Sequence, residues 1–228
     1  MSPTIIYIEG NIGTGKSTFL KQLDESYLKK KYNYDVIYEP VDDWQKIGIL
    51  EKFYSDPKKY CYLFQSYCLF TRFQLLRKIE SSLDYIFIER SIFSDKYVFA
   101  TGCKELGQLD DIEYNIYDTW FNNFLKNHPV DYYHIYLRVD PRVCLERINT
   151  RNRGEESGIG LDYLTLLHDK HENWSRCNNK FIKVYDNTKR LIGEKVIQDI
   201  NLLLKHTSSF ERPISSCGST IHSSLSCT

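Results

Sequence analysis

Residues 10–18 read Gly-Asn-Ile-Gly-Thr-Gly-Lys-Ser-Thr and follow an apolar run at residues 5–8. Two glycines separated by four residues, then lysine and serine, give the Walker A spacing, here after a run of strand character and before a helical pattern. Backbone N–H groups of such a loop close around phosphate oxygens, the lysine reaches the outer phosphates and the serine can hold Mg²⁺. We therefore expect ATP or another nucleoside triphosphate to bind at Gly10, Asn11, Ile12, Gly13, Thr14, Gly15, Lys16, Ser17 and Thr18. The loop alone leaves open whether the chain is a GTPase, a motor ATPase or a small-molecule kinase.

Two acidic side chains end later runs of β-branched and aromatic residues. Glu39 ends the run at residues 35–39, and Glu89, followed by Arg90, ends the run at residues 85–89. In phosphoryl transfer to a hydroxyl, a carboxylate accepts the hydroxyl proton while cations stabilise the moving phosphoryl group, so Glu39 is the candidate general base. Glu89 is the candidate partner of Mg²⁺, and Arg90 is expected to face the phosphates. The structural alternatives are a helix-capping role for Glu39 and an ion pair between Glu89 and Arg90.

Three arginines, Arg147, Arg151 and Arg153, are spaced so that they pass from a helix into the glycine-containing segment at residues 153–158. Guanidinium groups stay charged and offer a planar fork for phosphoryl oxygens, and a mobile loop can bring them in while it excludes water. We therefore expect an arginine lid that contributes to catalysis and binds the donor. The alternative is a solvated basic helix end, which the helix dipole would favour.

The elements that position these groups follow from five short runs at residues 4–8, 35–39, 85–89, 132–139 and 181–185, which alternate with segments of helical periodicity. This pattern predicts an α/β fold with a five-stranded parallel sheet and helices on both faces. Ligands of such sheets bind beyond the carboxyl ends of the strands, where the candidate residues lie. Asp56-Pro57 and Asp140-Pro141 are predicted to begin helices, because Asp is a favoured N-cap and Pro a favoured first helical residue.

Composition limits the class of protein. The 228 residues carry 30 Lys+Arg and 30 Asp+Glu, which gives no reason to expect binding to polymeric nucleic acid or to a membrane. Seven cysteines without a metal-like or redox spacing are typical of reduced thiols, and no apolar run reaches the roughly 20 residues of a spanning helix. We expect a cytoplasmic protein with one domain at residues 1–206 and a serine-rich disordered tail at residues 207–228.

Several ordered motifs together resemble the deoxynucleoside kinase family, whose deoxycytidine, deoxyguanosine and mitochondrial thymidine kinases share one P-loop kinase fold. The likeness covers residues 4 to about 205. The motifs are the segment at 8–18, Glu39-Pro40-Val41 with Trp44, Phe64-Gln65, Glu89-Arg90-Ser91 with Ser94-Asp95, the segment from Cys144 to Glu156, and residues 167–174. The resemblance implies ATP-dependent phosphorylation of a small deoxynucleoside at its 5′-hydroxyl with Mg²⁺, and it assigns the proton-accepting role to Glu39.

The resemblance also implies how the acceptor is bound. Gln65 would meet the hydrogen-bonding edge of the base, Trp44 and Phe99 would pack around it, and Tyr54 with Glu156 would contact the sugar 3′-hydroxyl. Arg90 would steady the 5′-oxygen and the phosphates, and Asp186 with Asn187 would meet the donor nucleobase. Family members are homodimers, so we expect a homodimer here.

Two charged residues indicate which bases are accepted. Arg72 and Asp95 match the pair that deoxycytidine and deoxyguanosine kinases keep in the base pocket, where thymidine-preferring members have apolar residues. A carboxylate held by arginine accepts from an exocyclic amino group, whereas thymine would leave buried charge uncompensated. We therefore predict deoxycytidine and purine deoxynucleosides over thymidine. Cys68 stands where the deoxycytidine kinases that this chain resembles have alanine, and its bulk leaves the ranking among these bases open.

Two other functions compete with this interpretation. A nucleoside monophosphate kinase of the thymidylate kinase type shares the phosphate loop and an arginine lid, but tends to have arginine before the Glu-Pro pair where this chain has Tyr38. A nucleotide-binding interaction module without catalysis is the second alternative. The presence of Lys16, Glu39, Glu89 and Arg90 together with the lid arginines argues against it.

Overall fold

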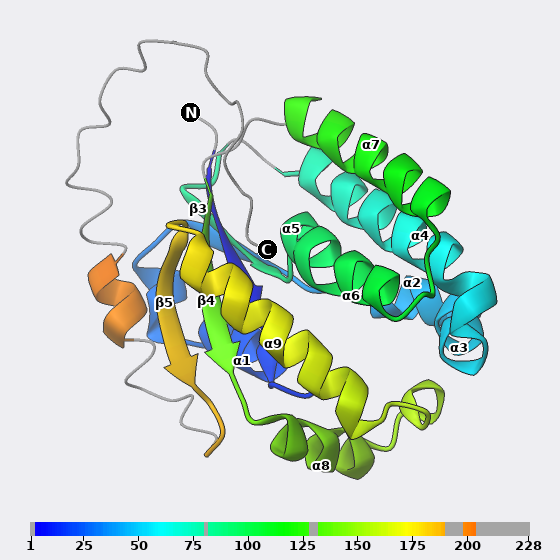
Figure 1. The fold of residues 1–228 in the computed structure, drawn as a ribbon. Helices are drawn as coiled ribbons and strands as arrows, with labels where there is room; N and C mark the ends of the chain where they lie inside the picture. The colour runs from blue at the N-terminus through cyan, green and yellow to red at the C-terminus, as the bar shows by residue number, and fades with distance from the viewer. Residues whose placement is uncertain (1–2, 80–81, 128–131, 190–197, 204–228) are drawn as a thin grey trace. The chain divides into compact units, whose positions relative to one another are not determined.

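A five-stranded parallel sheet forms the centre of the fold in the computed structural model, which describes residues 3–79, 82–127, 132–189 and 198–203 (Figure 1). The strand order is β2-β3-β1-β4-β5. The strands are β1 (Thr4–Glu9), β2 (Tyr34–Ile37), β3 (Tyr85–Glu89), β4 (Tyr132–Arg138) and β5 (Phe181–Asp186). The predicted α/β class with a five-stranded parallel sheet is confirmed.

The helices fill the connections between the strands. The α-helices are α1 (Lys16–Asp24), α2 (Val41–Lys46), α3 (Ile49–Ser55), α4 (Pro57–Arg77), α5 (Ile92–Ser94), α6 (Thr101–Glu105), α7 (Asp111–Asn127), α8 (Pro141–Arg151) and α9 (Leu161–Cys177). Two 3₁₀ turns, η1 (Tyr27–Lys30) and η3 (Gly154–Glu156), and one π-helical segment, η2 (Asp95–Ala100), complete them.

Both faces of the sheet are covered. Every residue of β1 and of β3 is buried, as expected for central strands of a parallel sheet. Figure 1 shows α9 in front of β4, and α4 and α7 running alongside each other. The largest core cluster joins residues of the sheet to α3, α4 and α7 and includes Tyr7, Phe53, Phe64, Phe93 and Phe121.

Strand β2 ends two residues earlier than the sequence predicted. It is an edge strand that pairs only with β3, and its last pair is Ile37 with Ile88. The next positions of β3 are Glu89 and then Arg90, whose φ of 62° turns the chain out of the strand. Glu39 would have to pair with that turn, so it lies in the connection between β2 and α2 instead.

The two predicted helix starts are confirmed. The Asp56 side chain accepts a hydrogen bond from the Lys59 N–H at the start of α4, and Asp140 accepts from the Arg142 N–H at the start of α8. A proline is the first residue of each helix, where its missing N–H costs no hydrogen bond.

The chain divides into two compact units, Met1–Gly193 and Glu194–Thr228, and the sheet with its helices belongs to the first. In the second unit, residues 198–203 are helical. The predicted tail at residues 207–228 lies outside the described residues, so the domain boundary stays a prediction. No helix among the described residues has the length and apolar character that crossing a membrane requires.

Candidate active site

The phosphate loop joins β1 to α1 and is held against its neighbours by polar contacts. Asn11 donates from Nδ2 to the Leu164 carbonyl at 2.8 Å, and Thr14 donates from Oγ1 to the Asn11 carbonyl at 3.1 Å. Gly13 has φ 82°, and a Cβ there would lie 2.6 Å from the Cys144 carbonyl oxygen of α8. Only glycine fits this close approach without movement of the backbone.

Lys16 is folded back over the loop. Its Nζ donates to the carbonyls of Gly10 at 3.2 Å and Asn11 at 2.9 Å, and the residue is 5% exposed. Burial and the nearby Arg90 lower the pKa of Lys16 to about 8. A bound phosphate would oppose both effects, since it supplies the negative charge that this buried ammonium lacks.

The end of β3 brings Glu89 to the loop. Ser17 Oγ donates to Glu89 Oε1 at 2.8 Å, so a hydroxyl and a carboxylate oxygen from two elements lie side by side. No cluster of three or more His, Cys, Asp or Glu side chains that could hold a metal occurs in the described part of the chain. Mg²⁺ is commonly bound by one or two protein oxygens together with substrate phosphates and waters, and the Ser17–Glu89 pair fits that pattern.

Glu39 lies between two arginines. Its Oε1 forms an ion pair with Arg72 Nη2 and lies 3.3 Å from Arg90 Nε, while 15% of the Glu39 side chain stays exposed. Burial would raise the pKa of Glu39, but the charges of Arg90, Arg72 and Lys16 outweigh it and lower the pKa to about 2. Glu39 is therefore ionised at neutral pH and lies next to two cationic side chains.

Helix α4 aligns three predicted base-pocket residues, Gln65, Cys68 and Arg72, and all three are buried. Asp95 reaches the same pocket from η2, where its Oδ2 accepts from Arg72 Nε at 2.7 Å. Burial raises the pKa of Asp95 to about 6 despite the Arg72 charge. Arg72 thus bridges Asp95 and Glu39, and its Nη1 also donates to the Glu89 carbonyl at 3.2 Å.

Aromatic rings form the walls around these polar groups. Trp44 meets Phe64 edge-on with ring centroids 5.6 Å apart, and Phe53 stacks on Phe64 at 4.7 Å. The Arg90 guanidinium lies 4.3 Å from the centroid of the Phe99 ring. Flat apolar walls with a few fixed polar groups are the usual surroundings of a small planar ligand.

The three arginines predicted to form one clamp, Arg147, Arg151 and Arg153, lie in two different places. Arg151 and Arg153 both pair with Glu156, the latter at 3.1 Å. Arg147 instead donates to the carbonyls of Asn187 at 2.9 Å and Thr188 at 3.0 Å. The structure therefore brings Arg151 and Arg153 to the cavity and leaves Arg147 at the connection after β5.

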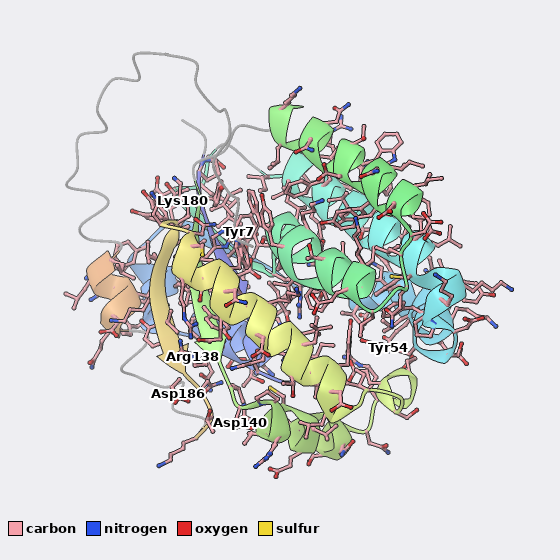
Figure 2. The ribbon with its side chains drawn as sticks, in the orientation of Figure 1. Tyr7, Tyr54, Arg138, Asp140, Lys180 and Asp186 are labelled. Carbon is pink, nitrogen blue, oxygen red and sulfur yellow. The ribbon has the colours of Figure 1, made fainter. Side chains whose placement is uncertain are left out.

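The two residues predicted to meet the donor base, Asp186 and Asn187, also differ in their surroundings. Asn187 is buried and donates from Nδ2 to the Thr14 carbonyl at 2.8 Å, so it braces the phosphate loop. Asp186 is exposed, and its Oδ1 accepts from the Thr188 N–H at 2.9 Å. Figure 2 shows Asp186 and Asp140 where β5 and β4 end, and Tyr54 beside the segment that follows α8.

One cavity of about 680 Å³ collects most of these groups. All ten residues predicted to bind the acceptor line it, together with Lys16, Ser17 and Glu89. These ten are Glu39, Trp44, Tyr54, Gln65, Cys68, Arg72, Arg90, Asp95, Phe99 and Glu156. Gly10, Asn11, Thr14, Arg147, Asp186 and Asn187 are not among the lining residues.

The sequence analysis did not identify Asp42, Asp43, Leu50, Phe53 and Tyr163 as lining residues, and it named Phe64 and Tyr38 without a site role. Leu50 and Phe53 belong to α3 and Phe64 to α4, whose helical periodicity indicates burial but not which ligand they would face. Tyr163 lies in the first turn of α9 and carried no sequence signal of its own.

Comparisons with known proteins show which family the chain is similar to. The sequence model of the family described as deoxynucleoside kinase matches residues 6–210. A probable deoxycytidine kinase of Fowlpox virus (strain NVSL) is 40% identical over 179 residues, which are 77% of this chain and 73% of the relative. Deoxycytidine kinase 2 of Gallus gallus is 34% identical over 234 residues, 90% of this chain and 83% of the relative. The mitochondrial deoxyguanosine kinase of Xenopus laevis is 33% identical over 193 residues, 73% of this chain and 71% of the relative.

Proposed function

The chain belongs to the deoxynucleoside kinase family, and from this premise we propose that it transfers the γ-phosphoryl group of ATP to the 5′-hydroxyl of deoxycytidine and purine deoxynucleosides. Family membership makes the chain a nucleoside kinase with an ATP-type donor. The choice of acceptor, the use of Mg²⁺ and the role of each residue are our proposal. The observation that carries it is the single cavity in which the phosphate-loop Lys16, the carboxylate of Glu39 and the buried Arg72–Asp95 pair all take part.

In the proposed reaction, the acceptor 5′-oxygen forms a bond to the γ-phosphorus while the bond from that phosphorus to the β,γ-bridging oxygen breaks. Glu39 accepts the 5′-hydroxyl proton, and the products are a deoxynucleoside monophosphate and ADP. A carboxylate with a pKa of about 2 is a weak base in the free protein. Donor phosphates would compensate the charges of Arg90 and Lys16, which hold that pKa down, and so make Glu39 more basic when the site is filled.

Arginine and lysine side chains supply the positive charge for transfer. Lys16 would hold the outer phosphates, and Arg90 would contact both the 5′-oxygen and the moving phosphoryl group. Arg151 and Arg153 would exchange their contacts with Glu156 for phosphate oxygens, which frees Glu156 for the sugar 3′-hydroxyl. Mg²⁺, held through Ser17 and Glu89, would neutralise charge on the donor phosphates.

The base preference rests on Gln65, Arg72 and Asp95. The Gln65 amide offers a donor and an acceptor, which suits the edge of cytosine or adenine. Asp95 is fixed by Arg72 and accepts from an exocyclic amino group. Thymine has no amino group there, so Asp95 would gain no donor beyond Arg72 in a buried pocket.

The monophosphate kinase alternative requires a cation for the acceptor phosphate. The two arginines beside Glu39 already have carboxylate partners: Arg72 pairs with Asp95 and Glu39, and Arg90 pairs with Glu39. Tyr38, at the position before Glu39, lines the cavity mouth and is uncharged. These contacts favour an uncharged hydroxyl acceptor.

We also propose a homodimer formed through α4 and α7. These helices pack on each other through Phe73 and Phe124, whose rings stack at 4.1 Å. Five large apolar side chains of the pair stay 43–72% exposed: Leu63 and Phe70 on α4, and Ile112, Ile116 and Trp120 on α7. On α7 they recur every four residues, which places them on one helical face. Exposed apolar side chains gathered on two packed helices are typical of an interaction surface, and two copies would cover them symmetrically.

A cytoplasmic location stays a proposal that rests on the cysteines. Cys61, Cys68, Cys103 and Cys144 are buried free thiols. Free thiols at this frequency are typical of a reducing compartment.

The proposed function is tested by an ATP-dependent phosphorylation panel with deoxycytidine, deoxyadenosine, deoxyguanosine, thymidine and thymidylate. We expect 5′-monophosphates from the first three, with thymidine a poorer acceptor and thymidylate inert. 2′,5′-Dideoxycytidine, which lacks the acceptor hydroxyl, serves as the control for ATP hydrolysis. Exclusive use of thymidylate would refute the hydroxyl acceptor, and a preference for thymidine over deoxycytidine would refute the role of the Arg72–Asp95 pair.

A further inference from the structure

Three buried polar side chains outside the cavity lie on two of the central strands and just beyond a third. They are His134 on β4, Glu9 on β1 and Ser91 two residues after the end of β3, and none of them lines the cavity. His134 and Glu9 are 0% exposed and Ser91 is 1% exposed. Glu9 Oε1 accepts from Ser91 Oγ at 2.5 Å and lies 3.2 Å from His134 Nδ1. The mechanism proposed above uses none of the three.

Glu9 is charged in spite of its burial. Burial would raise the pKa of Glu9, but the contacts with His134 and Ser91 lower it to about 2. A carboxylate can only accept hydrogen bonds, so His134 carries a proton on Nδ1. The His134 ring is stacked between Tyr7 at 5.5 Å and Phe181 at 4.7 Å, which fixes the donor in place.

Ser91 is held from the other side as well. Its Oγ accepts from the Ser94 N–H at 3.2 Å, and its own N–H donates to Ser94 Oγ at 3.3 Å. This reciprocal cap begins helix α5. The Ser91 hydroxyl therefore donates a hydrogen bond to Glu9 and accepts one from the Ser94 N–H. Its position is determined by both β1 and α5.

The residue before Ser91 has an unfavourable backbone conformation. Arg90 has φ 62°, and among the described residues only Asn152 is another non-glycine residue with positive φ. Residues with a long side chain rarely adopt a positive φ unless the surrounding structure imposes it. The Arg90 N–H donates to the Ile8 carbonyl of β1 at 2.9 Å, so β1 holds the chain on one side of Arg90 and, through Glu9 and Ser91, on the other.

We propose that Glu9, oriented by His134, is a positioning residue that acts through Ser91 to keep Arg90 in its left-handed conformation and its guanidinium beside Glu39. This inference rests on the proposed function, in which Arg90 steadies the moving phosphoryl group. Without the Glu9–Ser91 bond, the turn relaxes toward the extended conformation that β3 would otherwise continue. The Arg90 guanidinium then moves away from Glu39 Oε1, to which its Nε is 3.3 Å distant.

Ser91→Ala removes the bond with the smallest change in volume. We expect kcat to fall about 10- to 100-fold, as a displacement of about 1 Å at a reacting centre can cause, while KM for deoxycytidine changes little. Glu9→Gln keeps the size and the accepting oxygen, so it should retain most of the wild-type kcat, whereas Glu9→Leu should lose as much as Ser91→Ala. Because Glu9 and Ser91 act through one bond, kcat of the double variant Glu9→Leu/Ser91→Ala should fall no further than that of either single variant.

The control is Ser26→Ala, which removes a serine cap from η1 and should leave kcat unchanged.

A wild-type kcat in Ser91→Ala would overturn the proposal, as would an equal loss in Glu9→Gln and Glu9→Leu. If Glu9→Leu does not fold, Ser91→Ala against Glu9→Gln makes the same distinction. A crystal structure of Ser91→Ala gives a readout independent of catalysis: φ of Arg90 should leave the positive region, and an unchanged φ refutes the positioning role. An inactive wild-type protein would instead refute the proposed function, and this structural comparison would still decide the inference.

Discussion

At the scale of single residues, Arg72 links the residue proposed to select the base to the residue proposed to accept the proton. It holds Asp95, which is proposed to select the base, and it contacts Glu39, which is proposed to accept the proton. A base that satisfies Asp95 would therefore leave Arg72 in place beside Glu39. A base that does not satisfy Asp95 would disturb Arg72 and therefore Glu39. The choice of base would then affect kcat as well as binding.

The pH dependence of deoxycytidine phosphorylation should report the protonation of Asp95. Its pKa is raised by burial to about 6, so the carboxylate gains a proton as pH falls through that value and becomes a weaker, uncharged acceptor for the amino group. Between pH 8 and pH 5, at saturating ATP, kcat/KM for deoxycytidine should fall on the acid side. Glu39, with a pKa of about 2, stays ionised over this range.

Asp95→Asn is the control for this profile, because it removes the titrating group while it keeps the shape. Its kcat/KM should be low and should lack the inflection near pH 6. A wild-type profile that is flat from pH 8 to pH 5 would contradict the assignment.

The sequence predicted much of the site at this scale, because polar residues at strand ends and at helical spacing carry a readable pattern. Gln65, Cys68 and Arg72 are spaced at i, i+3 and i+7, and the structure buries all three on α4. It did not predict that Arg147 contacts the carbonyls after β5, since a spacing on a helix does not tell which neighbour each guanidinium meets. It also gave no sign of the Glu9–Ser91 bond, which joins residues 82 positions apart.

At the scale of elements, the phosphate loop depends on its fit against α8. Gly13→Ala would place a methyl group 2.6 Å from the Cys144 carbonyl, and it would also strain a residue with φ 82°. We expect a raised KM for ATP and a loss of unfolding free energy of more than about 1 kcal/mol, because the left-handed conformation alone costs an alanine about that much. The measurements are ATP kinetics and denaturant unfolding.

Gly48 provides a matched control for Gly13. It has φ 74°, but nothing lies within 4 Å of a Cβ built there. Gly48→Ala should therefore show the conformational cost alone and leave the KM for ATP unchanged. Equal effects of the two substitutions on ATP binding would show that the contact with α8 does not matter.

Element boundaries were less predictable than element order. The five apolar runs gave the strands and their parallel arrangement, but β2 ends at Ile37 rather than at Glu39. The cause is a long-range one, since the turn at Arg90 ends the partner strand. The π-helical segment at Asp95–Ala100 was not predicted either, because its apolar pattern is close to that of an ordinary helix.

At the scale of the whole molecule, the homodimer should depend on the exposed apolar face of α4 and α7. Trp120→Glu places a charge in the middle of that face, where Trp120 is 50% exposed. We expect mass measurement in solution to give a dimer for the wild type and a monomer for the variant, because burying an unpaired carboxylate in an apolar interface is unfavourable. Tyr27→Glu, at a tyrosine of η1 that is 53% exposed, is the control and should stay dimeric. A monomeric wild type, or a dimeric Trp120→Glu, would refute the interface.

The central claim is that Glu39 accepts the proton of a deoxynucleoside 5′-hydroxyl, and the most direct test is the kcat of Glu39→Gln for ATP-dependent phosphorylation of deoxycytidine. General-base catalysis typically contributes about 10²- to 10⁴-fold, so kcat should fall within that range while deoxycytidine still binds. Glu51→Gln, which neutralises an exposed carboxylate on α3 outside the cavity, should match the wild type. A kcat of Glu39→Gln close to that of the wild-type protein would contradict the claim.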